Sequence, residues 1–542
     1  GVGVLNDENT GVGVLNDDMD TSDNADVPAI DMQDNITAGP TMNLRPRRPA
    51  RKPTHLLGRG FEDAFIFMTA QMSVKKGLKL FKKKGADAVL AEMQQLHYRE
   101  VIKPMYRDSL TREQKRAALH YLMFLKQKRC GRIKARGCAD GRKQRMWKTK
   151  HETSSPTVRT ESVFITSIID AMERRRVVTV DIPGAFMQAD IDEVVHVKLE
   201  DELAELLARV DHDLYSKYIV IENGKKVIYV QLQKALYGTL QAALLFWKEL
   251  SGFLVNELGF MLNPYDNCVA NKSINGKQCT ICWHVDDLKI SHCEQDVLEQ
   301  VLNALSERFG KEDPLTITRG DIHDYLGMTL DFSAEGKVKF TMTDFIDSML
   351  EELPSDMEGH AATPAANHLF KVNKKATKLD DQTAEMFHTN VAKLLYLSKR
   401  ARPDIQTAVA FLSTRVVAPD TDDYGKLRRC MMYIRGTKDL PLVLEGDQAG
   451  RIRWWVDASF AVHHDMKSHT GAVMSLGKGA AYGMSTRQKI NSTSSTEAEL
   501  IGVSDAMPNV VWTRNFLLSQ GFAVNDNVVY QDNQSAILLE KN

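Results

Sequence analysis

The sequence predicts an α+β fold in which helices and β-hairpins alternate irregularly. Two Asn-Gly pairs, at 223–224 and 275–276, each separate two short apolar segments, which is typical of a two-residue hairpin turn. Apolar residues recur with helical spacing over 241–258 and 295–309, and the chain is also largely helical in pattern over 380–434. Hairpins between helices indicate antiparallel pairing, so the pattern favours α+β over a doubly wound α/β fold.

The other elements are predicted in chain order from local patterns. The repeat GVGVLND at 1–7 and 11–17, with the Asp, Asn and Pro after it, predicts a disordered acidic linker and then a Pro/Arg tether to about residue 55. Beyond it we expect helices over 86–98 and 110–128, the second capped by Asp108 or Ser109, a basic strand at 132–136, a helix over 161–173, a strand over 177–181, and a strand-rich module from 451.

Length and charge indicate several domains and an anionic partner. A chain of 542 residues is too long for one hydrophobic core and predicts about three domains. Residues 1–44 carry nine acidic and no basic side chains, whereas residues 45–150 carry 29 Lys and Arg against 8 Asp and Glu. A basic block of this size favours phosphate binding. A single cluster such as 82–84 is also explained by a solvated helical face or a nuclear-import stretch.

We expect a soluble, intracellular protein, in the cytoplasm and possibly also in the nucleus. There is no run of about 18 apolar residues, and the N-terminus lacks a basic-then-apolar signal. Seven scattered cysteines favour free thiols in a reducing compartment. Cys279 and Cys282 have C-x-x-C spacing, but they lie in a strand pattern without a second pair. Packing therefore explains them better than zinc or redox chemistry.

Three carboxylates form the first candidate site. Asp286 and Asp287 lie between two apolar segments at a predicted hairpin tip, and Asp181 ends the apolar strand 177–180 about a hundred residues upstream. Carboxylates from different strands can hold two Mg²⁺ or Mn²⁺ ions, which neutralise the attacking and leaving oxygens in phosphoryl transfer. An Asp-Asp pair alone is common in acidic loops. The order and spacing of all three predict the metal site of a polymerase palm.

A second acidic set lies near the C-terminus. Asp457 follows the apolar stretch 454–456, Glu499 lies in a helix start capped by Ser494, and Asp532 ends a strand. These three could hold two further Mg²⁺ ions that activate water. Glu497 is the alternative on the helix, and we prefer Glu499 because apolar residues follow it directly. The simpler interpretation is that both aspartates are turn residues at strand ends.

Several sequence blocks, in one order, carry a resemblance to a known family. Over about residues 85–542 the chain resembles the reverse transcriptase–RNase H portion of copia-type LTR retrotransposon polyproteins. The blocks are KARGCADG (Lys134–Gly141), VDIPGAFMQADIDE (Val180–Glu193), KALYGTLQAALLFW (Lys234–Trp247), HVDD (His284–Asp287), DYLGMTLDF (Asp324–Phe332), LLYLSKRARPDI (Leu394–Ile405) and SSTEAEL (Ser494–Leu500).

The resemblance implies a right-hand polymerase followed by a C-terminally truncated RNase H-like α/β domain. Fingers and palm would span 56–345, a helical thumb or connection 346–445, and the RNase H-like domain 446–542. A fourth carboxylate of that domain would lie beyond Asn542, so we expect weak or no RNase H activity. The implied activity is RNA-directed DNA polymerisation. The implied partners are an RNA template, a DNA primer, RNA–DNA hybrid, dNTPs, integrase and other polyprotein modules, in a virus-like particle and without a membrane.

The resemblance also implies roles for individual residues. Asp181, the Ile182 carbonyl, Asp286 and Asp287 would bind the polymerase metals, and Asp457, Glu499 and Asp532 those of the nuclease. Around the nucleotide, the implied residues are Lys134 and Arg136 for the triphosphate, Phe186 as the steric gate against a ribose 2′-hydroxyl, and Tyr237, Gly238 and Gln241 beside nucleotide and template. Leu326-Gly327-Met328 would grip the primer.

Each of the nucleotide-site roles has a simpler alternative. Phe186 is also explained as a core residue, Lys134 and Arg136 as nonspecific phosphate contacts, and Tyr237 as a packing residue.

The chain departs from the family at three positions, and two other functions stay open. His284 replaces a tyrosine before Val-Asp-Asp, Ala243 replaces a proline, and Pro183 stands where a lysine is more usual. None of these removes a metal ligand. The first alternative is a decayed or repurposed remnant that binds nucleic acid without catalysis. The second is another palm-type enzyme such as a nucleotidyl cyclase, which the basic block and the RNase H-like segment disfavour.

Overall fold

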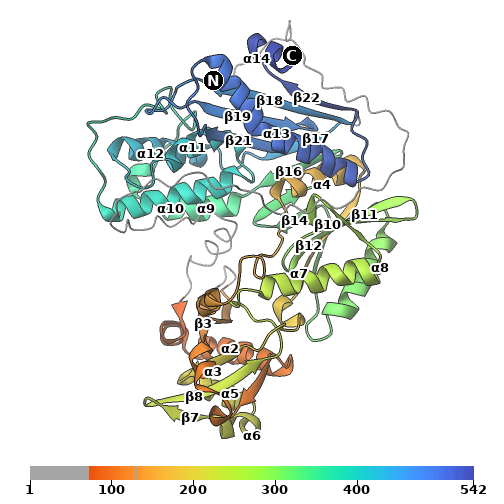
Figure 1. Ribbon diagram of the computed structural model, residues 1–542, viewed down its shortest axis with the longest axis vertical. Coiled ribbons are helices and arrows are strands. Elements are labelled where there is room, and N and C mark those ends of the chain that lie inside the picture. The colour runs from red at the N-terminus through yellow and green to blue at the C-terminus, as the bar shows by residue number, and fades with distance from the viewer. Residues whose placement is uncertain (1–71, 128–130, 448, 542) are drawn as a thin grey trace, which may run out of the picture. The chain divides into compact units, whose positions relative to one another are not determined.

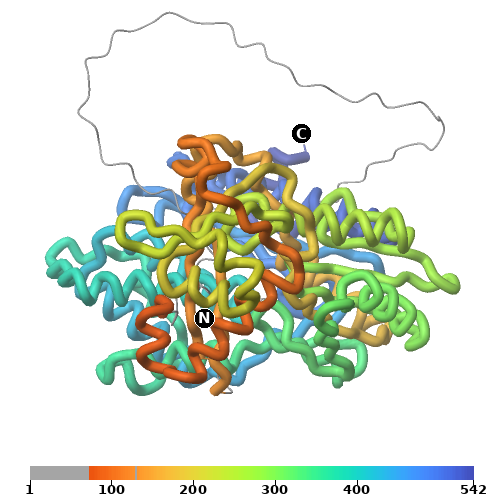
Figure 2. Tube along the Cα trace, turned by 90° about the horizontal axis from the view of Figure 1, so that it is seen from below, coloured from red at the N-terminus to blue at the C-terminus, as the bar shows by residue number. Residues whose placement is uncertain are grey.

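The computed structural model describes residues 72–127, 131–447 and 449–541, which form four β-sheets with helices packed against them (Figure 1). This arrangement confirms the predicted α+β class. The predicted acidic linker and Pro/Arg tether, residues 1–55, lie outside the described residues. In the described ranges, no helix has both the length and the apolarity needed to cross a bilayer. Figure 2 shows the course of the chain in a second view, turned by 90° from that of Figure 1.

The first sheet has seven strands in the order β1-β3-β6-β8-β2, with β4 paired to β3 and β7 paired to β8. Helices α2 and α5 bury apolar side chains against it. The Asn223-Gly224 turn joins β7 to β8, which confirms the first predicted hairpin. The elements are β1 (Met72–Ser73), α2 (Val74–Tyr98), β2 (Ile102–Met105), α3 (Arg112–Ala117), β3 (Leu119–Gln127), β4 (Ile133–Ala139), β6 (His196–Glu200), α5 (Glu202–Val210), α6 (His212–Tyr215), β7 (Val220–Glu222) and β8 (Lys225–Leu232).

The predicted helix over 110–128 is wrong. Only α3 is helical there, and Thr111 caps it in a capping box with Gln114, in place of the two capping residues that the sequence predicted. The rest of the segment is strand β3, whose side chains alternate between buried and half-buried positions. β3 pairs with β4 from Tyr121 to Gln127 and with β6 at Leu119 and His120. These long-range pairings outweigh the local helical spacing.

The second sheet has six strands in the order β13-β5-β12-β11-β10-β9. The Asn275-Gly276 turn joins β10 to β11, and the helices predicted over 241–258 and 295–309 are present, the first ending in a π-helical turn. The elements are β5 (Arg176–Asp181), α7 (Ala242–Gly252) with its π-turn Phe253–Glu257, β9 (Met261–Asn263), β10 (Asp266–Ile274), β11 (Lys277–His284), β12 (Asp287–His292), α8 (Gln295–Phe309) and β13 (Thr316–Arg319).

Cys279 and Cys282 both lie buried in β11 as free thiols. Burial raises the pKa of the Cys279 thiol to about 12, so this group stays protonated at neutral pH. The Thr166 hydroxyl lies 3.9 Å from the Cys282 sulfur, within weak hydrogen-bonding distance. The prediction that this pair serves packing is therefore confirmed.

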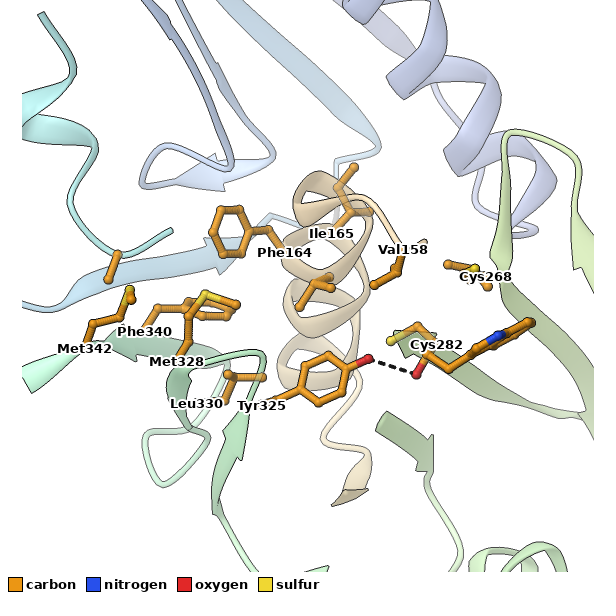
Figure 3. Close-up of a cluster of buried hydrophobic side chains, with 14 of the residues drawn as sticks. Val158, Phe164, Ile165, Cys268, Cys282, Tyr325, Met328, Leu330, Phe340 and Met342 are labelled. Atoms are coloured by element: carbon orange, nitrogen blue, oxygen red, sulfur yellow. Dashed lines mark hydrogen bonds between the residues drawn. The ribbon is translucent and has the colours of Figure 1, made fainter. Parts of the chain in front are cut away.

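The third sheet has the strand order β14-β15-β16-β17-β20, and helix α4 (Thr160–Met172) lies between it and the second sheet (Figure 3). The Phe164 ring of α4 meets Phe340 edge to face at 4.7 Å. Across the same core the Tyr325 hydroxyl donates a hydrogen bond of 3.1 Å to the Cys282 carbonyl. The strands are β14 (Ile322–Tyr325), β15 (Met328–Asp331), β16 (Lys337–Thr341), β17 (Leu442–Gly446) and β20 (Gly477–Lys478).

Four α-helices separate β16 from β17 in the chain, and the last three confirm the helical pattern predicted past residue 380. They are α9 (Thr343–Glu351), α10 (Asp381–Ser398), α11 (Gln406–Ser413) and α12 (Thr421–Gly436). Phe387, Phe411 and Leu427 from three of them are fully or almost fully buried. These helices belong to the same hydrophobic cluster as the second and third sheets.

The fourth sheet has the strand order β21-β19-β18-β22 and carries the long helix α13 on one face. Its elements are β18 (Arg451–Ser459), β19 (His469–Ser475), β21 (Tyr482–Arg487), α13 (Ser495–Ser519), β22 (Asp526–Tyr530) and α14 (Gln534–Lys541). The strand-rich module predicted from 451 is therefore confirmed.

Helix α13 joins the fourth sheet to the second. The guanidinium of Arg159 lies 3.9 Å from the Trp512 ring centroid, and the Trp512 indole N–H donates to the Tyr265 carbonyl at 2.9 Å. Phe516 of α13 and Trp454 of β18 belong to the same hydrophobic cluster as the second sheet. The fourth sheet thus shares a core with the second.

Candidate active sites

The pairing of two strands brings the first carboxylate set to one edge of the second sheet. β5 and β12 are antiparallel neighbours, and Asp181 lies directly opposite Asp287 in their register. Cross-strand partners point to the same face of a sheet, so both carboxylates project from one face. Asp286 lies in the two-residue turn between β11 and β12, and its carbonyl accepts a 3.0 Å hydrogen bond from the Ile182 N–H. We call Asp181, Asp286 and Asp287 the palm trio.

The turn between β11 and β12, which contains Asp286, is strained. Val285, which precedes Asp286, has a φ of 59°. A β-branched residue rarely adopts this left-handed region, and such strain costs about 1–3 kcal/mol and gathers at functional sites. The pairing of His284 with Asp287 and the bond from Ile182 hold the turn in place.

The electrostatics of the palm trio favour a bound cation. Burial, and after it the negative charges of Asp286 and Asp181, raise the pKa of Asp287 to about 7. Burial and Asp181 also raise the pKa of Asp286. Carboxylates that repel one another in this way are stabilised by a divalent cation, whose preferred ligands are carboxylate oxygens. The donor set therefore fits Mg²⁺ or Mn²⁺.

The palm trio is loosely arranged. Two other acidic trios among the described residues have one side-chain oxygen from each member within 4.8 Å of the others, and the palm trio does not reach this spacing.

Three side chains form a row beside the palm trio. The Arg136 guanidinium of β4 lies 4.6 Å from the Tyr237 ring centroid, and the Tyr237 ring lies 4.4 Å from the Phe186 ring. Burial, and after it the charge of Asp286, raises the pKa of Tyr237. The charge interaction places this row next to the carboxylates. Lys134, predicted with Arg136, lies two residues earlier on the same face of β4 and is exposed.

Two of the predicted nucleotide contacts are in different surroundings than expected. Gln241 is fully buried, and its side chain is bonded to Gln144 and Glu193, so it cannot touch a nucleotide in this structure. Gly238 has a φ of 89°, and a Cβ there would lie 2.1 Å from the Ala139 carbonyl oxygen. A close approach of two backbones explains this glycine.

The other predicted positions around the palm trio differ in their exposure: one is fully buried, three are half-buried, and one segment forms a turn. The Ile182 side chain is fully buried. His284, Pro183 and Ala243, the positions where the chain departs from the family, are all half-buried. The predicted primer-gripping segment is a two-residue hairpin turn, in which Leu326 and Gly327 both have positive φ.

The second carboxylate set is compact. Asp457 lies on β18, Glu499 on α13 and Asp532 just beyond β22, and one oxygen of each lies within 4.8 Å of the other two. We call these residues the nuclease trio. Glu499 is buried, and its carboxylate accepts a 3.1 Å hydrogen bond from the Gln531 side chain. Burial raises the pKa of Glu499 to about 7, with the charge of Asp457 as a further cause.

Glu497 has a capping role instead. It lies on the exposed side of the helix start, where its backbone N–H donates to the Ser494 hydroxyl at 3.1 Å. Its carboxylate accepts hydrogen bonds from the Thr493 hydroxyl and backbone N–H. Both carboxylate contacts lower its pKa. Of the two glutamates that the sequence offered, the structure brings only Glu499 to the aspartates.

The third acidic trio, Asp420, Asp422 and Asp423, is explained by helix capping. The Asp420 carboxylate accepts the N–H groups of both other residues at the start of α12. Arg415 pairs with Asp420 and Asp423. These contacts account for the cluster without a metal.

Sequence reasoning missed several partly or fully buried polar residues, one of them on β12 and two around Gln241. Lys289 is 1% exposed and forms an ion pair with the fully buried Asp170 of α4. A charged residue inside the apolar strand 288–290 was a signal that could have revealed it. Gln144 and Glu193 are the partners of Gln241. Gln144 lies in none of the quoted sequence blocks, and Glu193, at the end of the block Val180–Glu193, was given no role.

The chain is similar to reverse transcriptases. Residues 108–366 match the family model described as reverse transcriptase (RNA-dependent DNA polymerase). The Retrovirus-related Pol polyprotein from transposon TNT 1-94 of Nicotiana tabacum is 26% identical over 418 residues, 76% of this chain and 30% of the polyprotein. The Pol polyprotein from transposon RE2 of Arabidopsis thaliana is 27% identical over 411 residues, 75% of this chain and 26% of the polyprotein.

A yeast relative and one solved structure are more distant. The Transposon Ty1-ER2 Gag-Pol polyprotein of Saccharomyces cerevisiae is 21% identical over 410 residues, 72% of this chain and 22% of the polyprotein. The chain thus matches less than a third of the length of these three relatives. A foamy viral protease-reverse transcriptase, solved with double-stranded DNA, has 12% identity and a TM-score of 0.44 over 79% of this chain and 61% of that chain. This likeness is too low to establish a shared fold.

Proposed function

Since this chain carries the reverse transcriptase region of a Ty1/copia-type retrotransposon Pol polyprotein, we propose that its second sheet is the palm of an RNA-directed DNA polymerase. The first sheet would then be the fingers, and α9–α12 the thumb or connection. The observation that carries the proposal is the register of β5 against β12, which sets Asp181 opposite Asp287 with Asp286 in the adjoining turn.

The palm trio, with the Ile182 carbonyl, would hold two Mg²⁺ or Mn²⁺ ions. When bound, these ions neutralise charge on the triphosphate and lower the pKa of the primer 3′-hydroxyl. The carboxylates have to be ionised for this. Without bound ions the pKa of Asp287 lies near 7. Asp287 would therefore release a proton when the metal ions bind at neutral pH.

The row beside the palm trio would form the nucleotide site. Arg136 and Lys134 supply positive charge for the triphosphate, and their different side-chain geometries suit a bidentate and a point contact. Phe186, with Tyr237 packed on its ring, would crowd a ribose 2′-hydroxyl and so select deoxynucleotides. The basic strands and helices of the first sheet would hold the template through backbone contacts, and the turn at Leu326-Gly327 would hold the primer.

Primer extension with Mg²⁺ on an RNA template tests this proposal. Asp286→Asn with Asp287→Asn should abolish incorporation, because amides cannot replace anionic metal ligands. Asp296→Asn is the matched control, since Asp296 is an exposed aspartate in the first turn of α8. Equal incorporation by wild type and the double variant would refute the assignment. Salt-sensitive binding of RNA–DNA hybrid without extension, under Mg²⁺ or Mn²⁺, would support a non-catalytic remnant instead.

For the fourth sheet, we propose weak cleavage of the RNA strand in RNA–DNA hybrids. The compact spacing of the nuclease trio supports this, because three carboxylate oxygens within 4.8 Å can share cations. Hydrolysis of a labelled hybrid tests it, with Glu499→Gln expected to be inactive. Glu497→Gln is the matched control two residues away. If neither variant changes the rate of wild-type hydrolysis, the trio has no catalytic role.

A further inference from the structure

Three segments that are far apart in the chain meet around one half-buried carboxylate, that of Glu193, close to the row of Arg136, Tyr237 and Phe186. The Gln144 amide donates to Gln241 Oε1 at 2.8 Å and to Glu193 Oε1 at 3.3 Å. The Gln241 amide donates to the same Glu193 oxygen at 2.9 Å. Both glutamines are 0% exposed.

The remaining oxygens of Gln144 and Glu193 also have partners. The side-chain oxygen of Gln144 accepts the Leu240 backbone N–H at 2.9 Å. The second oxygen of Glu193 pairs with Lys148, whose side chain is 9% exposed, at 3.2 Å. Buried polar networks with every member satisfied are rigid, and loss of one member leaves the others unpaired.

The network fixes the loop that carries Tyr237. Leu240 and Gln241, two of its bonded groups, lie three and four residues beyond Tyr237. On the other side of the loop, the Ala139 N–H at the end of β4 donates to the Tyr237 carbonyl at 2.7 Å. A Cβ on Gly141 would lie 2.2 Å from the Gly238 carbonyl oxygen, so the loop is held directly against the backbone that follows β4.

We propose that Gln144, Glu193 and Gln241 form a positioning lock for the nucleotide site, and this inference rests on the proposed polymerase function. The lock residues touch no reactant. They hold the Tyr237 loop against β4, and thereby set the distance between the Arg136 guanidinium and the Phe186 ring. Binding of a dNTP depends on that distance, because Arg136 has to reach the triphosphate while Phe186 contacts the sugar.

The inference predicts a nucleotide-binding defect in Gln144→Met, a variant of similar side-chain size without hydrogen bonds. Binding of dTTP is measured by calorimetry on the full chain with an RNA template and a primer ending in a dideoxynucleotide, so that no chemistry follows. The dissociation constant for dTTP should rise about tenfold, because the variant loses the three side-chain hydrogen bonds of Gln144 and so loosens the Tyr237 loop. Discrimination between dTTP and UTP should fall, while affinity for primer–template stays unchanged.

Gln488→Met is the matched control. Gln488 is also buried, and it donates to the Thr470 hydroxyl at 3.0 Å and to the Ala498 carbonyl at 2.8 Å, near the fourth sheet. The Gln488→Met variant should have a lower thermal stability than wild type and an unchanged dissociation constant for dTTP. If Gln144→Met does not fold, Lys148→Met at the edge of the lock takes its place and should give a smaller defect of the same kind.

The outcomes separate this inference from the proposed function. Unchanged dTTP affinity and unchanged dTTP/UTP discrimination in a folded lock variant would overturn the lock. A wild-type protein that binds dTTP but does not extend a primer ending in a 3′-hydroxyl would overturn the proposed function, and the binding comparison would still decide on the lock. A wild-type protein that binds no dTTP would overturn both.

Discussion

The palm trio and the nuclease trio are both sets of three carboxylates, but they are drawn together to different degrees. Both have a carboxyl group whose pKa is about 7, Asp287 in one and Glu499 in the other. The nuclease trio is drawn together within 4.8 Å by a strand, a helix and a loop. The palm trio lies on a strained hairpin beside a strand end and is more open. This difference agrees with the proposed functions, since a polymerase site has to admit a triphosphate and a primer end, whereas a nuclease site needs only water and a phosphodiester.

The largest expected effect separates the two trios. Asp181→Asn should reduce primer extension by about 10⁴-fold, equivalent to about 5 kcal/mol of transition-state stabilisation. Because Asp181 is not part of the nuclease trio, hydrolysis of RNA–DNA hybrid by the same variant should be unchanged. Both rates are measured on one preparation of full-length protein. A parallel fall in both rates would mean that the two trios are coupled.

The next largest effect concerns the stability that the buried ion pair of Lys289 and Asp170 gives to the second sheet. Lys289→Met should destabilise the protein by about 3–5 kcal/mol, because it leaves the buried Asp170 carboxylate without its main partner. Arg175, 3.8 Å from Asp170, would only partly compensate. Denaturant unfolding measures this loss. The double variant Lys289→Met/Asp170→Leu should recover most of it, and failure to recover would show that the ion pair does more than satisfy two buried charges.

Acid should loosen the fourth sheet. Burial lowers the pKa values of His463 and His469 to about 4, and the Phe370 ring packs on both imidazoles. Below about pH 6.5 the unfolded chain takes up protons that the folded chain refuses, so stability falls as the pH drops from about 6.5 towards 4. We expect a loss of about 2 kcal/mol for each histidine at pH 5, about 4 kcal/mol for the pair.

Thermal unfolding between pH 5 and 7 measures the acid effect. The variant His463→Leu/His469→Leu should show a flatter pH dependence than wild type. An equally steep dependence in that variant would assign the effect to other groups.

The smallest effect tests the strain in the palm hairpin. Val285→Gly should raise stability by about 1 kcal/mol, because glycine adopts a φ of 59° without a steric penalty. Extension should nevertheless slow, since a looser turn holds Asp286 less firmly. Unfolding and extension are measured together. A variant that is no more stable than wild type would show that Val285 carries no strain.

The sequence predicted the parts of the fold that depend on local chemistry. Asn-Gly turns and long helical patterns were found correctly, because their signals lie within a few residues. The segment 119–127 was misread as helix, since its strand character depends on pairing with β4 and β6.

The candidate sites divide in the same way. The acidic residues could be found from their places after apolar strands and in a capped helix. The burial of Gln241 could not be predicted from the sequence, since it depends on Gln144, 97 residues away in the chain.

The contact between Arg159 and Trp512 has a practical consequence for handling the chain. Because α13 lies in the same hydrophobic cluster as the second sheet, a proteolytic nick between Gly446 and Arg451 would yield two fragments that copurify. Grafting the fourth sheet onto another protein would leave Trp512 and Phe516 facing water, and the graft would aggregate unless that surface were redesigned.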